Sequence, residues 1–194
     1  MLKQTAIAIA LVGLSSAAMA GNFQVKVGGS LVNPTQDTTV SGVGVVEAAN
    51  EYAFTPSVEY FFGNTGLSTE VLLATPVNHD VKINGANAVK LKHLPPVVTV
   101  KYNFNQDGRF NPYVGVGGAA FIPWDVEGVK DVKETFGVAG QVGFTYKPAD
   151  AKNWGVFFDA RYAKLSPEVK VNDTLKFDLD IDPMVYTLGY SYRF

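Results

Sequence analysis

From residue 22 onward, the chain consists largely of segments in which apolar residues alternate with small or polar ones. The C-terminal segment, 184–194, shows this alternation most clearly. One phase carries methionine, leucine and aromatic residues, and the other carries Val185, Thr187, Gly189, Ser191 and Arg193. Successive side chains of a β-strand point to opposite faces, so a period of two predicts a strand with one apolar face and one small or polar face.

Seven further segments show the same alternation. They are 23–33, 52–62, 67–77, 97–104, 112–122, 134–147 and 154–164, of which 112–122 is rich in glycine and ambiguous in phase. Most are close to the roughly 9–11 residues that a tilted membrane strand needs, and eight strands is the smallest number usual in bacterial outer-membrane barrels. Strands can span lipid only as a closed barrel, because lipid offers no partner to unpaired backbone groups. The pattern therefore predicts an all-β fold, an eight-stranded antiparallel transmembrane β-barrel of the outer-membrane type.

The links between these segments alternate between short and long. Links 63–66, 105–109 and 148–153 are short and rich in turn residues, whereas 33–51, 78–94, 123–133 and 166–182 are longer. Outer-membrane barrels have short periplasmic turns and longer extracellular loops, so the alternation also predicts the orientation. Links 78–94 and 166–182 each contain two alternating stretches around a turn, which predicts that the wall continues past the bilayer as an extended extracellular rim.

Residues 1–20 have the composition of a secretory signal peptide. Lys3 supplies a positive charge, residues 5–14 are apolar, and Ala18, Met19 and Ala20 form a small-x-small cleavage site. The apolar run is shorter than the roughly 20 residues of a membrane-spanning helix. We therefore expect a cleavable signal peptide over residues 1–20 and an outer-membrane barrel over residues 21–194.

Composition and motifs argue against several kinds of chemistry. The chain has no cysteine, and its 16 basic and 18 acidic residues give a net charge of −2, so nothing indicates a nucleic-acid partner. His79 and His93 lie in one long link without a third metal ligand at suitable spacing. No G-x-S-x-G motif or phosphate-binding glycine loop is present. We expect no enzymatic activity, catalytic residue, cofactor or metal site.

Placing the apolar phase against lipid leaves the other phase lining the lumen. An eight-stranded barrel is just wide enough for side chains to fill its interior, and buried single charges are costly, so inward charges should pair. We expect Glu59 and Glu70 to face Lys101 and Arg193. Two interpretations fit, a polar plug that fixes the strand register and a conduction path for ions. The predicted lumen charge network comprises Lys26, Glu59, Glu70, Lys101, Asp159, Arg161 and Arg193.

Towards the outer ends of the strands, the inward phase becomes apolar. This upper lumen could hold an apolar ligand that enters from outside, or it could be ordinary packing. Its predicted lining is Val32, Ala53, Leu72, Ala74, Val97, Ala163, Leu165 and Val185.

Two prolines lie in neighbouring predicted strands. Pro56 and Pro76 fall at similar heights when counted back from the 63–66 turn. Proline cannot donate to a strand ladder and is normally confined to strand ends, edges or bulges. The pair therefore indicates either a bulge or rim position, or a weak lateral seam that opens into the outer leaflet.

Polar and aromatic residues near the C-terminus indicate two partners. Tyr192 and the terminal Phe194 resemble the signal by which the outer-membrane barrel assembly machinery recognises its substrates. Asp178, Asp180 and Asp182 fall on one face of the last predicted rim strand. They form a solvated acidic face or hold divalent cations shared with lipopolysaccharide.

Several stretches resemble the OmpW/AlkL family of small outer-membrane barrels. They are Glu70 to Pro76, Lys92 to Pro96 with the following strand to Phe104, Pro112 to Gly117, Ala139 to Gly143, and Tyr192 to Phe194. The resemblance covers most of the mature chain, and the Leu94-Pro95-Pro96 stretch is its most specific part. It implies a porin-like channel in the cell outer membrane that passes small hydrophobic molecules.

The lumen pattern adds a route to this expectation. Because the lower lumen is charged, a hydrophobic solute is expected to leave sideways into the outer leaflet. The alternatives are a structural or receptor surface barrel without transport, and a narrow ion-conducting pore. The expected surroundings are outer-membrane lipid and lipopolysaccharide.

Overall fold

The computed structural model describes residues 22–36, 38–40, 44–48, 50–73, 77–83, 86–94, 96–127, 130–171 and 176–194. The predicted signal peptide, residues 1–20, lies outside these ranges. Within them, no helix has the length and apolar character needed to cross a membrane.

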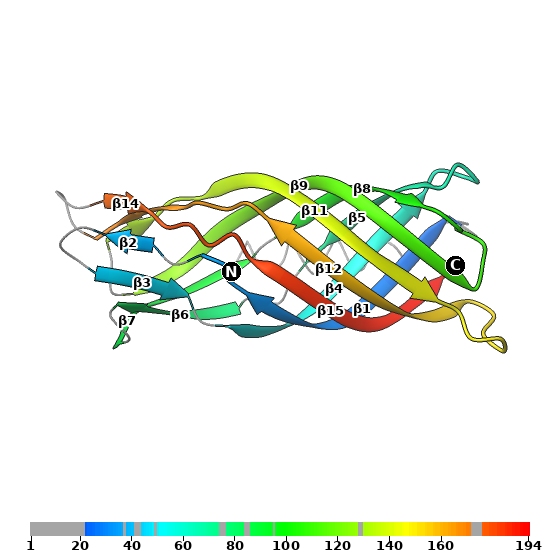
Figure 1. The fold of residues 1–194 in the computed structure, drawn as a ribbon, viewed down its shortest axis with the longest axis horizontal. Helices are drawn as coiled ribbons and strands as arrows, with labels where there is room; N and C mark the ends of the chain where they lie inside the picture. The colour runs from blue at the N-terminus through cyan, green and yellow to red at the C-terminus, as the bar shows by residue number, and fades with distance from the viewer. Residues whose placement is uncertain are drawn as a thin grey trace.

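Eight long strands form a closed antiparallel barrel (Figure 1). Each strand pairs with the next one along the chain, and the last pairs with the first from Gln24↔Arg193 to Asn33↔Met184. The predicted eight-stranded barrel is therefore confirmed. Its strands are β1 (Phe23–Asn33), β4 (Glu51–Phe61), β5 (Leu67–Leu72), β8 (Val97–Asn103), β9 (Phe110–Glu127), β11 (Thr135–Tyr146), β12 (Trp154–Ala163) and β15 (Met184–Arg193).

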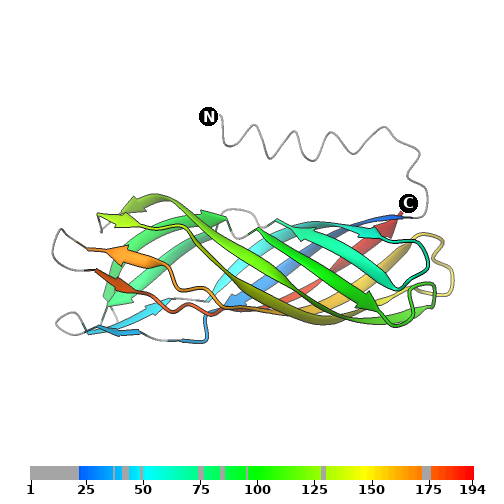
Figure 2. The same cartoon turned by 90° about the horizontal axis from the view of Figure 1, so that it is seen from above.

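Shorter strands prolong the wall at the end opposite the C-terminus, as Figure 2 shows after a turn of 90° from Figure 1. One set continues from β9 in the order β7, β6, β3, β2, and a separate sheet has the order β10, β13, β14. The rim predicted for links 78–94 and 166–182 is confirmed, but all four long links contain strands. The rim strands are β2 (Thr38–Val40), β3 (Gly44–Ala48), β6 (Val77–Ile83), β7 (Ala86–Leu94), β10 (Asp131–Val132), β13 (Glu168–Lys170) and β14 (Lys176–Asp178).

The alternation of burial matches the sequence pattern. In β8, for example, Val97, Thr99, Lys101 and Asn103 are buried, whereas the residues between them are exposed on the outer face. Of the predicted strand over 67–77, β5 covers Leu67–Leu72, Leu73 lies outside it, and β6 begins at Val77. The alternation does not change at Leu73, so the sequence pattern did not indicate this end.

The tight link between β4 and β5 requires glycine at two positions. Gly63 and Gly66 have φ angles of +62° and +76°, a region that other residues rarely adopt. The Thr65 hydroxyl donates to the carbonyl of Phe62 at 2.8 Å, which closes the turn. This geometry fixes the register that places Glu59 directly opposite Glu70.

The orientation can be tested by cysteine labelling, because the chain has no cysteine of its own. A membrane-impermeant maleimide added to intact cells should label Lys176→Cys, which is exposed on the rim strand β14, but not Asn64→Cys in the short turn. Both should be labelled after the outer membrane is permeabilised. Labelling of Asn64→Cys in intact cells would reverse the orientation.

The terminal residue gives a prediction about assembly. Phe194 donates its backbone N–H to the carbonyl of Phe23 at 2.9 Å, its ring contacts that of Tyr192, and the residue is 54% exposed. Deleting Phe194, or replacing it by alanine, should reduce the heat-modifiable protein in the outer membrane. The control is Phe104→Ala, which removes a similarly exposed ring away from the terminus. Normal levels of the Phe194 variants would show that the terminus is not an assembly signal.

Candidate functional site in the barrel lumen

Four charged side chains from four adjacent strands meet in the lower lumen, towards the end with the short turns. Lys26 lies on β1, Glu59 on β4, Glu70 on β5 and Lys101 on β8, so the charges run Lys–Glu–Glu–Lys around the wall. At most 2% of each residue is exposed. Two carboxylates directly opposite each other would repel, and the flanking lysines remove this penalty.

The four groups, which we call the charge quartet, are mutually paired. Lys26 Nζ lies 2.8 Å from Glu59 Oε2 and 3.3 Å from Glu70 Oε2. Lys101 Nζ lies 2.9 and 2.8 Å from the same two atoms. Each ammonium therefore contacts both carboxylates, which offsets part of the large cost of removing the charges from water.

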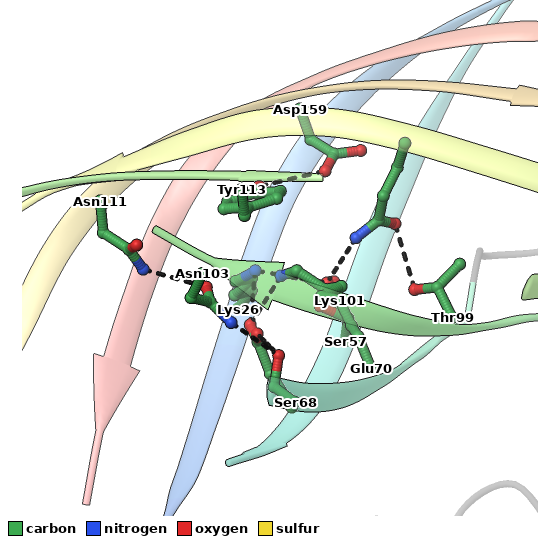
Figure 3. A network of polar contacts seen from close by, with 12 residues as sticks. Lys26, Ser57, Ser68, Glu70, Thr99, Lys101, Asn103, Asn111, Tyr113 and Asp159 are labelled. Atoms are coloured by element: carbon green, nitrogen blue, oxygen red, sulfur yellow. Dashed lines mark hydrogen bonds and ion pairs between the residues drawn. The ribbon is translucent and has the colours of Figure 1, made fainter. Parts of the chain in front are cut away.

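Polar and aromatic neighbours complete the surroundings of the quartet (Figure 3). Ser57 donates to Glu70 at 2.7 Å, and Ser68 donates to Glu59 at 2.5 Å. The ring of Tyr113, from β9, lies 3.8 Å from Lys101 Nζ and 4.8 Å from Lys26 Nζ, at cation–π distance.

Asp159 and Arg161, both from β12, form the next layer. The Tyr113 hydroxyl donates to Asp159 Oδ2 at 3.0 Å. Arg161 Nη2 lies 3.5 Å from Glu70 Oε1, and Arg161 Nε lies 3.4 Å from Asp159 Oδ1. The connected cluster thus contains three cations and three carboxylates and is electrically neutral as a whole.

Below the quartet, a chain of amide side chains reaches the short turns. Asn103 donates to Ser68 at 2.9 Å, and Asn111 donates to Asn103 at 3.0 Å. Gln106, in the turn between β8 and β9, donates to the carbonyl of Gly63 at 2.8 Å. These residues are buried, so they fill the lower mouth of the barrel.

Arg193 lies at the short-turn end of β15, as expected, but the contacts described for it are with residues at the mouth of the barrel. Its guanidinium lies 3.7 Å from Asp107, donates to the carbonyl of Gln106 at 3.3 Å and sits over the ring of Phe61. Arg193 therefore lies at the mouth and belongs to a different set of contacts from the quartet. Arg193 lies opposite Gln24 of β1, and Gln24 lies opposite Glu59 of β4, so one strand separates Arg193 from Glu59 at the same height.

Above the charged layers, an apolar cluster fills the lumen. Leu72, Val97, Ala119, Phe121, Ala139 and Ala163 come from the wall, and Leu165, Val132, Val169, Leu179 and Ile181 come from the rim and its links. The backbone of 165–167 binds that of 179–181 through hydrogen bonds from Leu179 to Pro167 and from Ile181 to Leu165. Rim side chains therefore pack against the wall and cover the upper lumen.

The predicted lining of the upper lumen is only partly in this cluster. Leu72, Val97, Ala163 and Leu165 belong to it. Ala53 is buried outside the cluster, Val32 and Val185 are partly exposed, and Ala74 lies outside the described residues. On this side, Ser30 instead shares hydrogen bonds of 2.7 and 2.6 Å with Thr55 and Thr187. The upper lumen is therefore apolar on the β5–β12 side and has hydroxyls on the β1 side.

The missing donor of Pro56 faces β5. Leu73 donates its N–H to the Pro56 carbonyl at 2.9 Å. In an antiparallel ladder, the N–H and the C=O of one residue point to the same neighbouring strand, so the nitrogen of Pro56 also faces Leu73. Pro56 can return no hydrogen bond to Leu73. The β4–β5 ladder therefore lacks one hydrogen bond at this height. Pro76 lies outside the described residues, so its place in the seam stays a prediction.

The acidic face expected on the last rim strand is not formed by all three aspartates. Asp178 and Asp180 are exposed, but Asp182 is buried, with a φ of +38°, and accepts hydrogen bonds from the Leu165 N–H and the Tyr162 hydroxyl. Nearby, Lys133 lies 2.7 Å from Glu168 and lowers the pKa of that carboxyl. In the part of the chain that the structure describes, no three potential ligands are placed to hold a metal ion.

Sequence reasoning missed several lumen residues. Tyr113 lies in the glycine-rich segment, where the other inward residues are Gly115, Gly117 and Ala119. The contrast between apolar and polar residues therefore did not show which side of this strand faces the lumen. An aromatic residue in the phase of glycines was the available signal. Gln141 falls in the inward phase of its strand, but its hydrogen bonds from Thr99 at 3.2 Å and to Glu70 at 3.3 Å were not predicted, because it is uncharged.

Comparison with known proteins agrees with this architecture. A family model described as OmpW family matches residues 19–194. The chain is 30% identical over 224 residues to Outer membrane protein W of Vibrio cholerae serotype O1, with 100% of each chain covered.

Two solved structures share the fold. Outer membrane protein OprG from Pseudomonas aeruginosa superposes with a TM-score of 0.80 at 23% identity, covering 90% of this chain and 96% of OprG. The solid-state NMR structure of outer membrane protein AlkL has a TM-score of 0.67 at 21% identity and covers 93% of both chains.

The charge quartet gives a prediction about stability. Glu70→Gln should leave buried cations without their shared carboxylate and lower the free energy of unfolding by about 3–5 kcal/mol. The measurement is the urea unfolding midpoint of protein folded into lipid vesicles. The control is Asp107→Asn, because Asp107 is 74% exposed and its pair with Arg193 should contribute less than about 1 kcal/mol. Equal midpoints for wild type and Glu70→Gln would mean that water reaches the quartet and that the lower lumen is open.

Proposed function

Since the chain belongs to the OmpW family, we propose that this outer-membrane barrel takes up small hydrophobic molecules and releases them sideways into the outer leaflet. The observation that carries the proposal is the division of the lumen. An apolar upper half lies above buried charged layers, in which the four quartet residues are mutually paired.

The upper lumen supports entry of an apolar solute. Burying apolar surface is worth about 25 cal/mol per Å², so a small hydrocarbon gains several kcal/mol on leaving water. The alanines at positions 119, 139 and 163 leave the wall with short side chains. Rim side chains such as Val169 and Ile181 supply the cover that has to move.

The lower lumen opposes onward passage. A solute moving down would have to separate Lys26 and Lys101 from Glu59 and Glu70, and breaking buried pairs is costly. It would then meet the buried amides of Asn103 and Gln106 at the mouth. A solute that passed into the periplasm would lose the transfer free energy gained in the apolar lumen, and it would have to break these contacts as well.

The β4–β5 boundary supports a sideways exit. The ladder lacks one hydrogen bond at Pro56, and Leu72, which lines the apolar cluster, is one residue before the Leu73 that pairs with Pro56. The weak point of the wall thus lies beside the apolar lumen. Opening at this place breaks fewer hydrogen bonds than opening elsewhere in a regular ladder.

A structural or receptor barrel is the second candidate. The apolar cluster is completed by rim residues, so the upper lumen is packed as a core would be. Such a barrel needs only its exposed rim for function. The two candidates differ in whether a hydrophobic solute crosses the outer membrane faster when the protein is present.

Uptake in cells tests the lateral route. Leu72→Asp should abolish protein-dependent uptake of a labelled alkane, because it places a charge in the apolar path. Pro56→Val should slow uptake, because valine can donate to the Leu73 carbonyl and restore the ladder. The controls are Leu72→Ile, which keeps the path apolar, and Pro112→Val, the same proline change in β9 near the short turns. Ionic conductance in planar bilayers should stay low and intermittent.

Two results would contradict the proposal. Uptake that survives both Leu72→Asp and Pro56→Val in folded protein excludes the lateral route. A large, steady conductance for hydrophilic ions shows an open pore through the charged layer. Absence of any protein-dependent uptake favours the receptor or structural barrel.

A further inference from the structure

Arg161 is buried without the hydrogen bonds that its side chain can make. Only 4% of the residue is exposed, and its Nε and Nη1 atoms have no hydrogen-bond partner. Both of its ion contacts are long: Nε lies 3.4 Å from Asp159 Oδ1 without forming a hydrogen bond, and Nη2 lies 3.5 Å from Glu70 Oε1. A guanidinium carries five N–H donors, and leaving buried donors unsatisfied is costly.

The neighbours of Arg161 do not share this feature. Lys26, Lys101, Glu59 and Glu70 all make side-chain hydrogen bonds, as does Gln141 next to Arg161 in the ladder. One further atom in the layer lacks a partner, Asp159 Oδ1, which faces Arg161 Nε. Unpaired donors and an unpaired acceptor are thus adjacent.

These atoms lie at the floor of the apolar upper lumen. Arg161 is paired with Gln141 in the β11–β12 register, and one inward step further up the same strands are Ala163 and Ala139, both in the apolar cluster. Across the lumen, Glu70 contacts Arg161, and Leu72 is the next inward residue above it on β5. A molecule in the upper lumen would therefore have an apolar wall around it and these polar atoms beneath it.

Charge balance decides which polar group fits. The cluster of Lys26, Lys101 and Arg161 with Glu59, Glu70 and Asp159 is already neutral. A carboxylate would add an uncompensated negative charge beside Asp159 in a buried site, which is unfavourable. An uncharged group that accepts from Arg161 and also donates to Asp159 Oδ1 satisfies both residues, and an aliphatic hydroxyl does both.

We propose that Arg161 and Asp159 form a head-group site for uncharged aliphatic alcohols, with the hydroxyl on these two residues and the hydrocarbon tail in the upper lumen. The site rests on the proposed function, because it uses the same apolar chamber. It narrows the substrate class from hydrophobic molecules to amphiphiles with one small polar end. The tail takes the place of rim side chains such as Val169, Leu179 and Ile181 against the wall.

The test uses purified full-length barrel in lipid nanodiscs and four probes of similar length: nonanol, methyl octyl ether, decane and octanoate. Binding is followed by the arginine Nε–H resonance that disappears in Arg161→Lys. Nonanol should shift this resonance and bind about tenfold more tightly than the ether, which only accepts a hydrogen bond. Decane and octanoate should leave the resonance in place.

Two variants separate the site from general hydrophobic binding. Arg161→Met combined with Asp159→Asn keeps the cluster neutral, and it should weaken nonanol binding about tenfold while leaving decane uptake unchanged. Asp159→Asn alone makes the cluster positive, and it should increase octanoate binding by about tenfold or more. The matched control is Arg109→Met, which replaces an exposed arginine in a short turn and should change neither nonanol binding nor octanoate binding.

The outcomes distinguish this site from the function on which it rests. If decane enters through the protein but nonanol neither shifts the Arg161 resonance nor loses affinity in the neutral double variant, the head-group site is wrong and the uptake function stands. If no probe enters or binds, the uptake function itself is wrong. If the double variant fails to fold, Asp159→Asn alone tests the site. Octanoate that binds this variant no more tightly than it binds the wild type would overturn the proposed head-group site.

Discussion

The structure depends on one constraint, that charges facing the lumen of a narrow membrane barrel must neutralise each other inside the protein. Eight strands leave no room for a continuous water column around them. Lys26, Glu59, Glu70 and Lys101 meet this requirement on four adjacent strands, where the two lysines flank the two glutamates and each ammonium contacts both carboxylates. A shift of one residue in any of these strands would turn a charge towards lipid, so the quartet and the strand register support each other.

The same constraint divides the lumen into two halves of different chemistry. Tyr113 covers the quartet with its ring and connects it to Asp159, and the polar chain continues downward through Asn103 to the mouth. Above Arg161, the wall becomes alanine, valine and leucine, and the rim covers it. Any molecule that dissolves in the upper half meets a barrier below and the proline-interrupted ladder at its side.

The eight strands and their inward phases could be predicted from the sequence because alternation is a local property. Lys26, Glu59, Glu70 and Lys101 were recognisable as inward charges, yet their partners depend on which strands are adjacent at a given height. Arg193 shows the limit: its phase was apparent, but its contacts with Asp107 and Phe61 arise from a turn that closes the mouth. The rim residues that complete the apolar cluster, such as Val132 and Leu179, lie outside the strong alternation and could not be placed without the fold.

The quartet has a consequence for biogenesis, because its members all lie between residues 26 and 101. They belong to the first four barrel strands, whereas closure needs the pairing of β15 with β1. A half-inserted chain that has formed only β1, β4, β5 and β8 can therefore already neutralise these four ionised groups. Neutralisation of these charges thus needs neither the C-terminal strands nor the seam that closes the wall.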